Sequence, residues 1–517
     1  MNLSTRIVAL VALLWLQLHP AAATLNPRFA EAERLYREGS YKQAHDEYQK
    51  LVDDLGSSED RRWVEFRLAE TMARSEAASE NADDSAARNA QQDLRKLVEE
   101  NARVDHIWAQ AQEALGDINW FGRREQYMWH QGWPHYEKAL DFWAGSTNLA
   151  VATERYWAII HKASQPPRVQ PFYFYGQFGN YLPLQVLENA LKIARNEDER
   201  ARAHFMIAMT IRNGGSWEQR FRIPHHFEES LKLKKDTNWY DDALFYYGEW
   251  MSSQGTGVQD ENGNWTFHPN YTKALELFRR LTSEFREGET QWFDDAQARI
   301  RGITQPSLQI SVAHIFLPQS EIEFHLNWRN IEEAEFTIYK ADLTKDIALA
   351  SKTAHSHGWM EGFNAASAEK VKTWKWQPKN QRPHAPGNDR IRLEEKLPVG
   401  AYIVVGRAGA VETRELILVS DLSIVTQSTG TQLLVYVCDS ASGAPAKNAA
   451  VRVWERRNNN NTVIWISHEK ATDEKGVTLF ELEPRGDYRE LFVAAKIGEK
   501  QALSLSNSGY SFANIDT

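Results

Sequence analysis

The spacing of apolar side chains changes abruptly at Gln305-Pro306, and this change constrains the fold more than any other feature of the chain. Upstream, apolar residues recur at the helical spacing, which is typical of helices packed along one face. Downstream, they alternate with polar residues, as in residues 321–328. Because a period of two is that of a half-buried strand, the sequence predicts an all-α region followed by an all-β region. A chain of 517 residues is also too long for one core, so we expect a multidomain protein.

The first helical pair is predicted from small and aromatic residues at fixed spacings. Ala32 and Leu35 share one helix face, and Gly39 allows a turn. The second helix presents a matching row, Tyr41, Ala44 and Tyr48. A weaker copy has Ala114, Leu115, Gly116 and Trp120 on its first helix, and Trp133, Tyr136, Ala139 and Trp143 on its second. This order resembles a tetratricopeptide repeat, which implies a tetratricopeptide-like helical repeat solenoid over residues 24–305.

Two copies of an aromatic-Asp-Asp-Ala pattern, at residues 239–243 and 292–296, form the best internal repeat. Their paired carboxylates fall at expected helix starts, where the helix dipole favours acidic groups. We favour this capping role over a pair of acid and base catalysts, which would need a cleft that repeated caps do not indicate. Residues 255–269, with several glycines, are predicted to be an insertion loop.

Aromatic residues also gather after Pro166-Pro167, at Tyr173, Tyr175, Phe178 and Tyr181. In one interpretation this strip binds an extended peptide on the concave face of a solenoid. In the other it fills irregular gaps between helices. The sequence leaves both interpretations open.

The chain begins like an exported protein. Arg6 precedes an apolar run over residues 7–18, and Ala21 and Ala23 suit a signal peptidase. Since the run is too short to cross a bilayer, we expect a signal peptide at residues 1–23, with an uncleaved anchor as the alternative. No membrane span is expected after signal removal, so the sequence predicts a periplasmic or secreted protein.

Charge and motif content narrow the function. A net charge of −10 offers no basic surface for nucleic acid, and Cys438, the only cysteine, excludes an intrachain disulfide framework. Zinc-hydrolase, Gly-x-Ser-x-Gly and phosphate-loop motifs are absent. The close histidine pairs, His225 with His226 and His355 with His357, are not expected to bind a metal. We therefore expect no cofactor, no metal site and no enzymatic activity.

Several short strands separated by turn residues predict two immunoglobulin-like β-sandwiches, over residues 306–420 and 421–517. The strands expected in the first are centred near Leu308, Phe324, Ile338, Val404 and Leu418. Those expected in the second are centred near Val435, Val453, Leu479 and Val493, with turns at residues 442–445 and 472–476 and a hairpin tip at residues 458–461.

This second half resembles the entry domains of bacterial alpha-2-macroglobulins. Their macroglobulin domains carry a strand ending in Asp, a Ser-Gly-x-Pro turn, an Ala-x-Val strand and a Thr-Asp-x-x-Gly turn, matched here by residues 435–439, 442–445, 449–453 and 472–476, with Phe480 following. The preceding unit is similar to a first macroglobulin domain at Pro318, Arg329-Asn330 and residues 397–402. Covalent members of the family use a Cys-x-Glu-Gln thioester. Cys438 is followed by Asp439, Ser440 and Ala441, so it cannot form one.

The resemblance implies a non-enzymatic exported protein of an endopeptidase-inhibiting, protease-trapping system, whose helical repeats dock a protein partner such as a protease or an envelope protein. One alternative is a tetratricopeptide-repeat envelope adaptor whose sandwiches are spacers without protease inhibition. Another is a carbohydrate-active or peptide-processing enzyme that uses the aromatic strip. No bait segment is identified, and we expect the sequence to be part of a longer protein.

Overall fold

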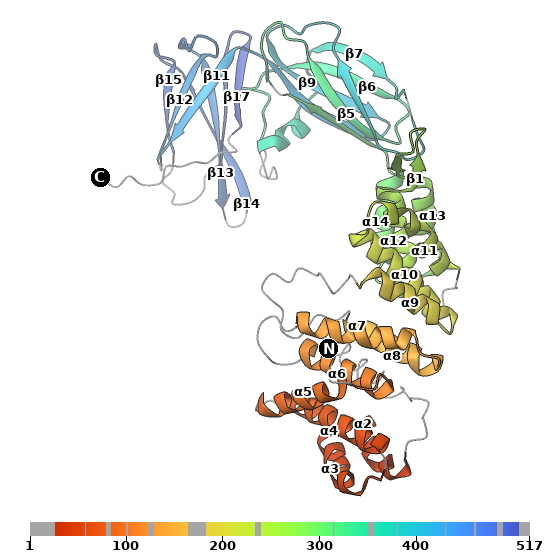
Figure 1. Cartoon of the computed structure of the whole chain (residues 1–517). Helices are drawn as coiled ribbons and strands as arrows, with labels where there is room; N and C mark the ends of the chain where they lie inside the picture. The colour runs from red at the N-terminus through yellow and green to blue at the C-terminus, as the bar shows by residue number, and fades with distance from the viewer. Residues whose placement is uncertain are drawn as a thin grey trace. The chain divides into compact units, whose positions relative to one another are not determined.

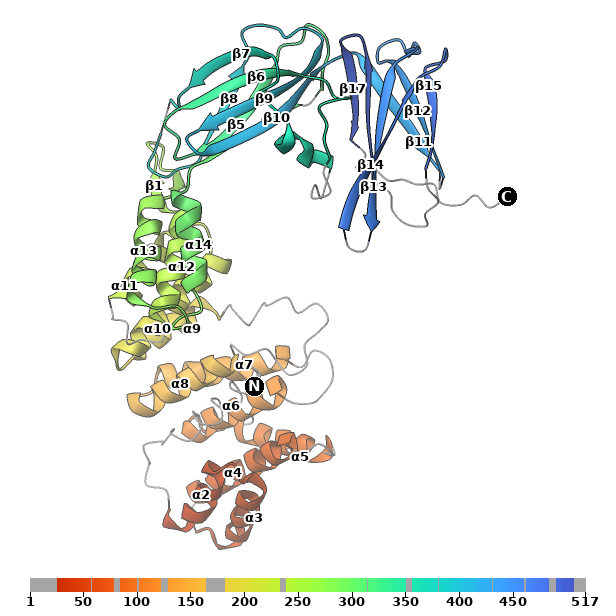
Figure 2. The same ribbon diagram turned by 180° about the vertical axis from the view of Figure 1, so that it is seen from behind.

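The computed structural model describes residues 26–56, 58–78, 84–99, 102–121, 129–163, 182–232, 239–313, 315–349, 356–379, 381–429, 431–459, 462–482 and 490–505. Contacts divide the chain into two compact units, residues 1–296 and 297–517. In the described residues the first unit is mainly helical and the second is built of sheets (Figures 1 and 2). The helix α14 (Phe293–Thr304) ends, and the strand β3 (Ser307–Val312) begins, where the sequence predicts the change of period.

From α2 to α13, each described helix of the first unit contacts the next one along the chain. Their bounds are α2 (Ala30–Arg37), α3 (Tyr41–Leu51), α4 (Ser58–Ala78), α5 (Asp84–Val98), α6 (His106–Phe121), α7 (Trp129–Ala144), α8 (Leu149–Ala163), α9 (Leu184–Ile193), α10 (Glu197–Gly214), α11 (Ile223–Leu231), α12 (Tyr240–Ser253) and α13 (Tyr271–Glu284). A helical region ahead of a β region is therefore confirmed. The finer description as a tetratricopeptide-like solenoid stays a prediction.

The helical pair predicted at the start of this region is confirmed. Ala32 in α2 and Ala44 and Tyr48 in α3 are buried in a common core. Gly39 has a φ of +81°, and the N–H of Ser40 donates to the carbonyl of Leu35 at 2.9 Å. The turn therefore needs the left-handed conformation that glycine adopts without strain.

The weaker copy is also a packed pair, formed by α6 and α7. Gly116 lies directly against the ring of Tyr136, because a Cβ added to it would be 2.4 Å from Cε1 of that ring. The rings of Trp120 and Tyr136 lie 5.8 Å apart. A glycine at this position lets the aromatic side chains fill the space between the helices.

The helix start predicted at Asp241 and Asp242 is confirmed, whereas a hydrogen-bonding cap role for their side chains is not. Both lie in the first turn of α12, as expected, but its N-cap residue is Trp239 and no side chain caps the helix. Asp241 Oδ2 instead accepts from Thr290 Oγ1 at 2.6 Å, and Asp242 Oδ1 accepts from Trp292 Nε1 at 2.7 Å. The carboxylates of the first copy therefore accept hydrogen bonds from Trp292, the first residue of the second copy, and from Thr290, two residues before it.

The insertion predicted at residues 255–269 is an ordered hairpin, so the expectation of a loop is wrong. Strand β1 (Thr256–Gln259) pairs with β2 (Trp265–His268) in an antiparallel register that places Gly257 opposite Phe267. At Gly255, where φ is +75°, an added Cβ would be 1.9 Å from the carbonyl oxygen of His268. The four-residue strands are too short for alternation to be recognised in the sequence.

The first sandwich comprises β3, β4 (Ile315–Phe316), β5 (Glu323–Arg329), β6 (Ala334–Ala341), β7 (Lys370–Trp376), β8 (Gly387–Arg392), β9 (Gly400–Ala408) and β10 (Val411–Val419). Its sheets have the orders β3-β5-β8 and β4-β10-β9-β6-β7, and they enclose one core. In β5 the buried residues are Phe324, Leu326 and Trp328, which confirms the predicted alternation. Tyr402 donates from its hydroxyl to the carbonyl of Pro398 at 2.9 Å, the tyrosine corner of immunoglobulin-like domains.

The second sandwich comprises β11 (Leu422–Ser428), β12 (Gln432–Asp439), β13 (Ala450–Asn459), β14 (Thr462–Ala471), β15 (Val477–Glu481), β16 (Leu491–Ile497) and β17 (Lys500–Leu505). Its sheets, β11-β12-β15 and β14-β13-β16-β17, also enclose one core. When β3 and β4 are counted as one strand that changes sheet, both sandwiches use the same order of strands. The β13–β14 hairpin is the one predicted around residues 458–461, and its paired strands extend beyond the partner β16 (Figure 1).

Candidate interaction surfaces

The turn residues that carry the macroglobulin resemblance come together at one end of the second sandwich. Asp439 Oδ1 accepts from the N–H groups of Ala441 and Ser442 at 3.2 and 2.9 Å. Asp473 Oδ1 accepts from the N–H groups of Lys475 and Val477 at 2.8 and 2.9 Å. In both turns an aspartate side chain replaces a backbone acceptor.

Gly476 holds these two turns against each other. It has a φ of +71°, and a Cβ added there would be 2.6 Å from the carbonyl oxygen of Val437 and 3.0 Å from Cβ of Pro445. Thr472 Oγ1 donates to the carbonyl of Ala446 at 2.6 Å and accepts from the N–H of Ala449 at 2.9 Å. Close packing between the turns accounts for these motif residues, so their role in the structure is to hold the two turns together.

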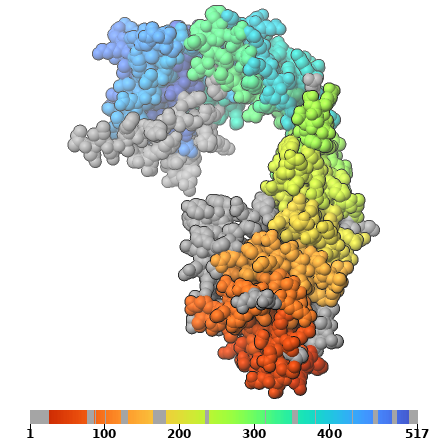
Figure 3. Space-filling view, in the orientation of Figure 1, coloured from red at the N-terminus to blue at the C-terminus, as the bar shows by residue number. Residues whose placement is uncertain are grey.

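The two sandwiches share a buried apolar surface, which we call the junction. The second sandwich contributes Trp454, Phe492 and Ala494. The first sandwich contributes one face of its larger sheet and the segment that follows β6. The buried residues of this surface are Tyr339, Ala341, Leu343, Ile347, Trp359, Phe363, Ala365, Ala401, Ile403, Val405, Leu416 and Leu418. Figure 3 shows the atoms of the two sandwiches in direct contact.

Polar contacts surround the apolar part of the junction. The side-chain amide of Gln501, which is 1% exposed, accepts from the N–H of Leu343 at 2.7 Å. Arg452 donates to the carbonyl of Thr344 at 2.8 Å, and Lys496 donates to Asp342 at 2.5 Å. Burial raises the pKa of Asp342, but the hydrogen bonds from Lys496 and Thr344 outweigh burial and hold this pKa below its usual range. The junction therefore combines apolar packing with hydrogen bonds between the two sandwiches.

The strand β9 shows how the sequence encodes the junction. Its side chains alternate between two cores, with Tyr402 and Val404 in the first sandwich and Ala401, Ile403 and Val405 in the junction. A strand that is covered on both faces has an unbroken apolar run, and residues 401–405 form such a run. The unbroken apolar run therefore indicates that the outer face of β9 is covered as well, which the sequence analysis did not identify.

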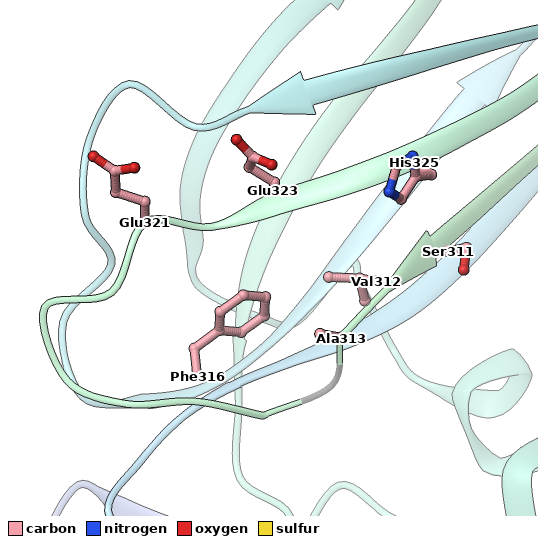
Figure 4. Close-up of a pocket in the computed structure, with 7 residues that line it drawn as sticks. All are labelled: Ser311, Val312, Ala313, Phe316, Glu321, Glu323 and His325. Carbon is pink, nitrogen blue, oxygen red and sulfur yellow. The ribbon is translucent and has the colours of Figure 1, made fainter.

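A hollow of about 580 Å³ opens where β3 gives way to β4 and the chain crosses from one sheet to the other. Glu321, Glu323 and His325 line one side, and Val312, Ala313 and Phe316 line the other (Figure 4). Glu321 is paired with Arg392, and Glu323 is paired with Arg390 at 3.3 Å. Because both carboxylates are neutralised on the surface, the hollow offers no concentrated charge to a ligand.

Aromatic side chains gather on the β1–β2 hairpin of the helical unit. Phe221, in the turn before α11, stacks on Phe267 at 4.9 Å and lies tilted against Trp265 at 4.0 Å between ring centroids. Trp217 meets Phe267 edge to face at 4.9 Å. Trp217 and Trp265 remain 45% and 39% exposed, so this patch presents two indoles to solvent. Exposed clusters of this kind are typical of contact surfaces.

A second exposed apolar surface lies on the outer face of the β11-β12-β15 sheet. Leu434 is paired in register with Leu479, and Val425 lies one strand away. These three side chains are 37%, 42% and 55% exposed. Like β9, the strand β12 has an unbroken apolar run, at residues 433–438, although one of its faces is open.

The histidines predicted not to bind metal form an unexpected contact. His204 in α10 and His226 in α11 lie with their Nδ1 atoms 2.9 Å apart, and the ring of His225 is 5.3 Å from that of His226. One of the two bonded nitrogens must carry a proton while the other accepts it. Of the described residues, no group of three His, Cys, Asp or Glu side chains has the arrangement of a metal site. Cys438 is a buried residue of β12.

Several sequence predictions fall outside the described residues. The signal peptide at residues 1–23 and the aromatic strip at Tyr173, Tyr175, Phe178 and Tyr181 are among them. The side chains of His355 and His357 also lie outside them. None of the helices in the described part of the chain combines the length and apolar content needed to span a bilayer.

No protein-family model matches the sequence, and no curated protein matches it. Two solved structures of native alpha-2-macroglobulin from Escherichia coli are similar to part of the chain. The structure of its domains MG0-NIE-MG1 has 14% identity and a TM-score of 0.26, and the match covers 39% of this chain and 64% of that one. The structure of NIE-MG1 has 13% identity and a TM-score of 0.26, with 39% and 97% covered. The chain thus spans less than two thirds of the first structure, and a TM-score this low carries no argument about function.

Proposed function

We propose that this chain is an exported, non-enzymatic binding protein of the alpha-2-macroglobulin type. Its helical unit docks a protein partner, and its two sandwiches form part of a protease-trapping body. The junction is the observation that supports this proposal most directly. It joins two sandwiches of equal strand order through a common apolar core that includes Trp454 and Phe492.

A trap that works by enclosure needs domains that keep their mutual arrangement when a protease presses on them. Sandwiches that serve only as spacers need a linker and little shared surface, because inter-domain contacts of spacers are small and polar. Residues on β6, β9 and β10 instead share one buried cluster with Trp454 and Phe492 of the second sandwich. The Ser-Gly-x-Pro and Thr-Asp-x-x-Gly turns that match the macroglobulin pattern add support from the sequence.

The alternative is an envelope adaptor that binds its partner through the helical unit and has no contact with proteases. The exposed indoles of Trp217 and Trp265 favour this second candidate. The two candidates place the principal binding surface in different units, and point variants can therefore separate them.

The test is complex formation between the full chain and endopeptidases of the serine, cysteine and metallo classes, with active sites blocked, followed by light scattering after gel filtration. We expect a complex with at least one class. We also expect Trp454→Asp, which places a charge in the junction, to weaken it, whereas Trp217→Ser leaves it unchanged. Circular dichroism and thermal unfolding check that each variant is folded.

The pattern of enzyme activity provides a second readout. The chain alone should leave the cleavage of large protein substrates unchanged, because two sandwiches are too few to enclose an enzyme. A panel in which no protease binds would remove the protease-trapping role. Partner binding that is lost in Trp217→Ser and kept in Trp454→Asp would favour the adaptor.

A further inference from the structure

Arg202 in α10 is a partly buried cation without a hydrogen-bonding partner in the described part of the chain. Its Nε atom is buried and makes no hydrogen bond. Arg67 shows the usual solution for a buried arginine, since it binds Glu33 at 3.0 Å and Glu70 at 2.7 Å. A buried charge is normally paired, so the surroundings of Arg202 call for a specific reason.

Two indole rings hold the guanidinium group of Arg202. Its central carbon lies 4.5 Å from the ring centroid of Trp157 in α8 and 5.1 Å from that of Trp239, which precedes α12. Trp239 is itself fixed against Phe205, at 5.5 Å between ring centroids. Cation–π contacts attract the guanidinium to these rings but satisfy none of its N–H groups.

Trp157 contacts the guanidinium group of Arg202 from a nearly buried position. Its ring is only 7% exposed, and its Nε1 atom is buried without an acceptor. The nearest acidic residues on the same helix are Asp198 and Glu199, and Glu199 is already paired with Arg195 at 3.3 Å. Burial lowers the pKa of Arg202, and the attraction of these two carboxylates only partly opposes burial. An arginine nevertheless stays protonated, so the charge persists.

The positions of the two indole rings determine which side of the Arg202 guanidinium group remains for a ligand. Since the indoles contact the guanidinium group, an acceptor is best placed at its edge, in the plane of the N–H groups. A carboxylate is planar and matches that edge with two parallel hydrogen bonds. Two oxygens of a phosphate can meet the same edge, but the anionic groups that an unmodified protein partner offers are carboxylates.

We infer that Arg202, Trp157 and Trp239 form a recognition site for a carboxylate of a protein partner, either an acidic side chain or a chain terminus. The site deepens the docking role proposed for the helical unit and rests on it. Arg202 donates hydrogen bonds to the carboxylate, and Trp157 and Trp239 orient Arg202.

The test uses the full chain and three synthetic peptides of one Gly/Ser backbone, titrated by calorimetry. One carries two glutamates and an amidated end, one carries two glutamines and a free terminal carboxylate, and one carries two glutamines and an amidated end. We expect binding of at least one carboxylate peptide and none of the neutral peptide. Comparison of the first two distinguishes a side-chain carboxylate from a terminal one.

Variants assign the binding to the site. Arg202→Met should weaken carboxylate binding at least tenfold, and Trp157→Leu, which removes a ring that orients Arg202, should weaken it several-fold. Arg212→Met is the matched control, because Arg212 is on the same helix and also contacts an aromatic ring, Tyr246, at 5.1 Å. Should Arg202→Met fail to fold, Arg202→Lys keeps the charge without the planar edge and is expected to lose binding too.

Three outcomes would overturn the inference. These are equal binding of the neutral peptide, unchanged binding by the folded Arg202 variant, and absence of binding by all three peptides. Failure here is distinguishable from failure of the protease role, because Trp454→Asp should keep carboxylate binding while it loses the protease complex.

Discussion

The side-chain amide of Gln501, in the last strand of the second sandwich, donates a hydrogen bond of 2.9 Å to the carbonyl of Ala341 in the first. The same amide accepts from the N–H of Leu343. One side chain thus satisfies two backbone groups at the end of β6, where the chain leaves the sheet. A buried amide that uses both its donor and its acceptor in this way fixes the relative register of the two surfaces.

Replacing Gln501 with Leu should destabilise the second unit by about 1–3 kcal/mol, because the N–H of Leu343 then stays buried without an acceptor. Urea unfolding of the full chain, followed by tryptophan fluorescence, measures the loss. Gln432→Leu is the matched control, since Gln432 is exposed at the start of β12. Equal effects of the two substitutions would contradict the role assigned to Gln501.

Gly116→Ala should destabilise the helical unit by about 1–3 kcal/mol, because the added methyl group overlaps the ring of Tyr136 at the α6–α7 contact. Gly302→Ala in α14 should do the reverse, with a gain of about 0.5–1 kcal/mol, since nothing lies within 4 Å of its added Cβ. Thermal unfolding of both variants tests the pair. A stabilising Gly116→Ala would show that the helices can separate at low cost.

Arg67→Met should cost about 3–5 kcal/mol, because it leaves Glu33 and Glu70 as buried carboxylates without their shared partner. Burial raises the pKa of Glu70, but Arg74 and Arg67 outweigh burial and bring this pKa to about 2. The control is Arg34→Met, whose ion pairs with Glu31 and Glu38 are exposed and should contribute little. Chemical denaturation at pH 7 compares the free energies of unfolding of the two variants. A similarly small loss of stability in both would show that the buried ion pairs of Arg67 contribute no more than the exposed ones of Arg34.

Acidification should destabilise the helical unit through His226. Burial, followed by the neighbouring His204 and Arg222, lowers the pKa of His226 from 6.5 to about 3, and Glu229 opposes this change only weakly. Between pH 6.5 and 3, His226 therefore binds a proton in the unfolded chain but stays neutral in the folded chain. The stability that neutral His226 provides is complete above pH 6.5 and is lost as the pH falls towards 3, by about 1.4 kcal/mol per unit.

Urea midpoints measured between pH 7 and pH 4.5 reveal this loss. His226→Gln should reduce the slope, whereas His268→Gln, at an exposed position of β2, should keep it. An unchanged slope in His226→Gln would assign the acid sensitivity to other groups.

Much of the fold could be predicted because its signals are local. The alternation around Phe324 and the spacing of Ala32, Ala44 and Tyr48 each reflect one face packed against one core. The turn at Gly476 follows from a conformation that few other residues adopt. Such features depend on neighbours in the sequence and are visible there.

The remaining features depend on partners distant in the sequence. Asp241 and Asp242 were expected to cap a helix, but their acceptor atoms bind Thr290 and Trp292. The contact of Arg202 with Trp157 and Trp239 likewise brings together three segments whose spacing shows no pattern. Junction residues such as Ile403 and Leu418 were correctly predicted to lie in strands, but nothing in a single strand identifies which surface will cover it.

The two-sided burial of β9 has a mechanical consequence. Bending the second sandwich away from the first would expose Trp454 and Phe492 to water, together with Ile403 and Val405 on the junction face of β9. Motion at this point is therefore resisted by the hydrophobic effect on many side chains at once. The two sandwiches should therefore move as one rigid body, so that a force applied to either sandwich is transmitted to the other.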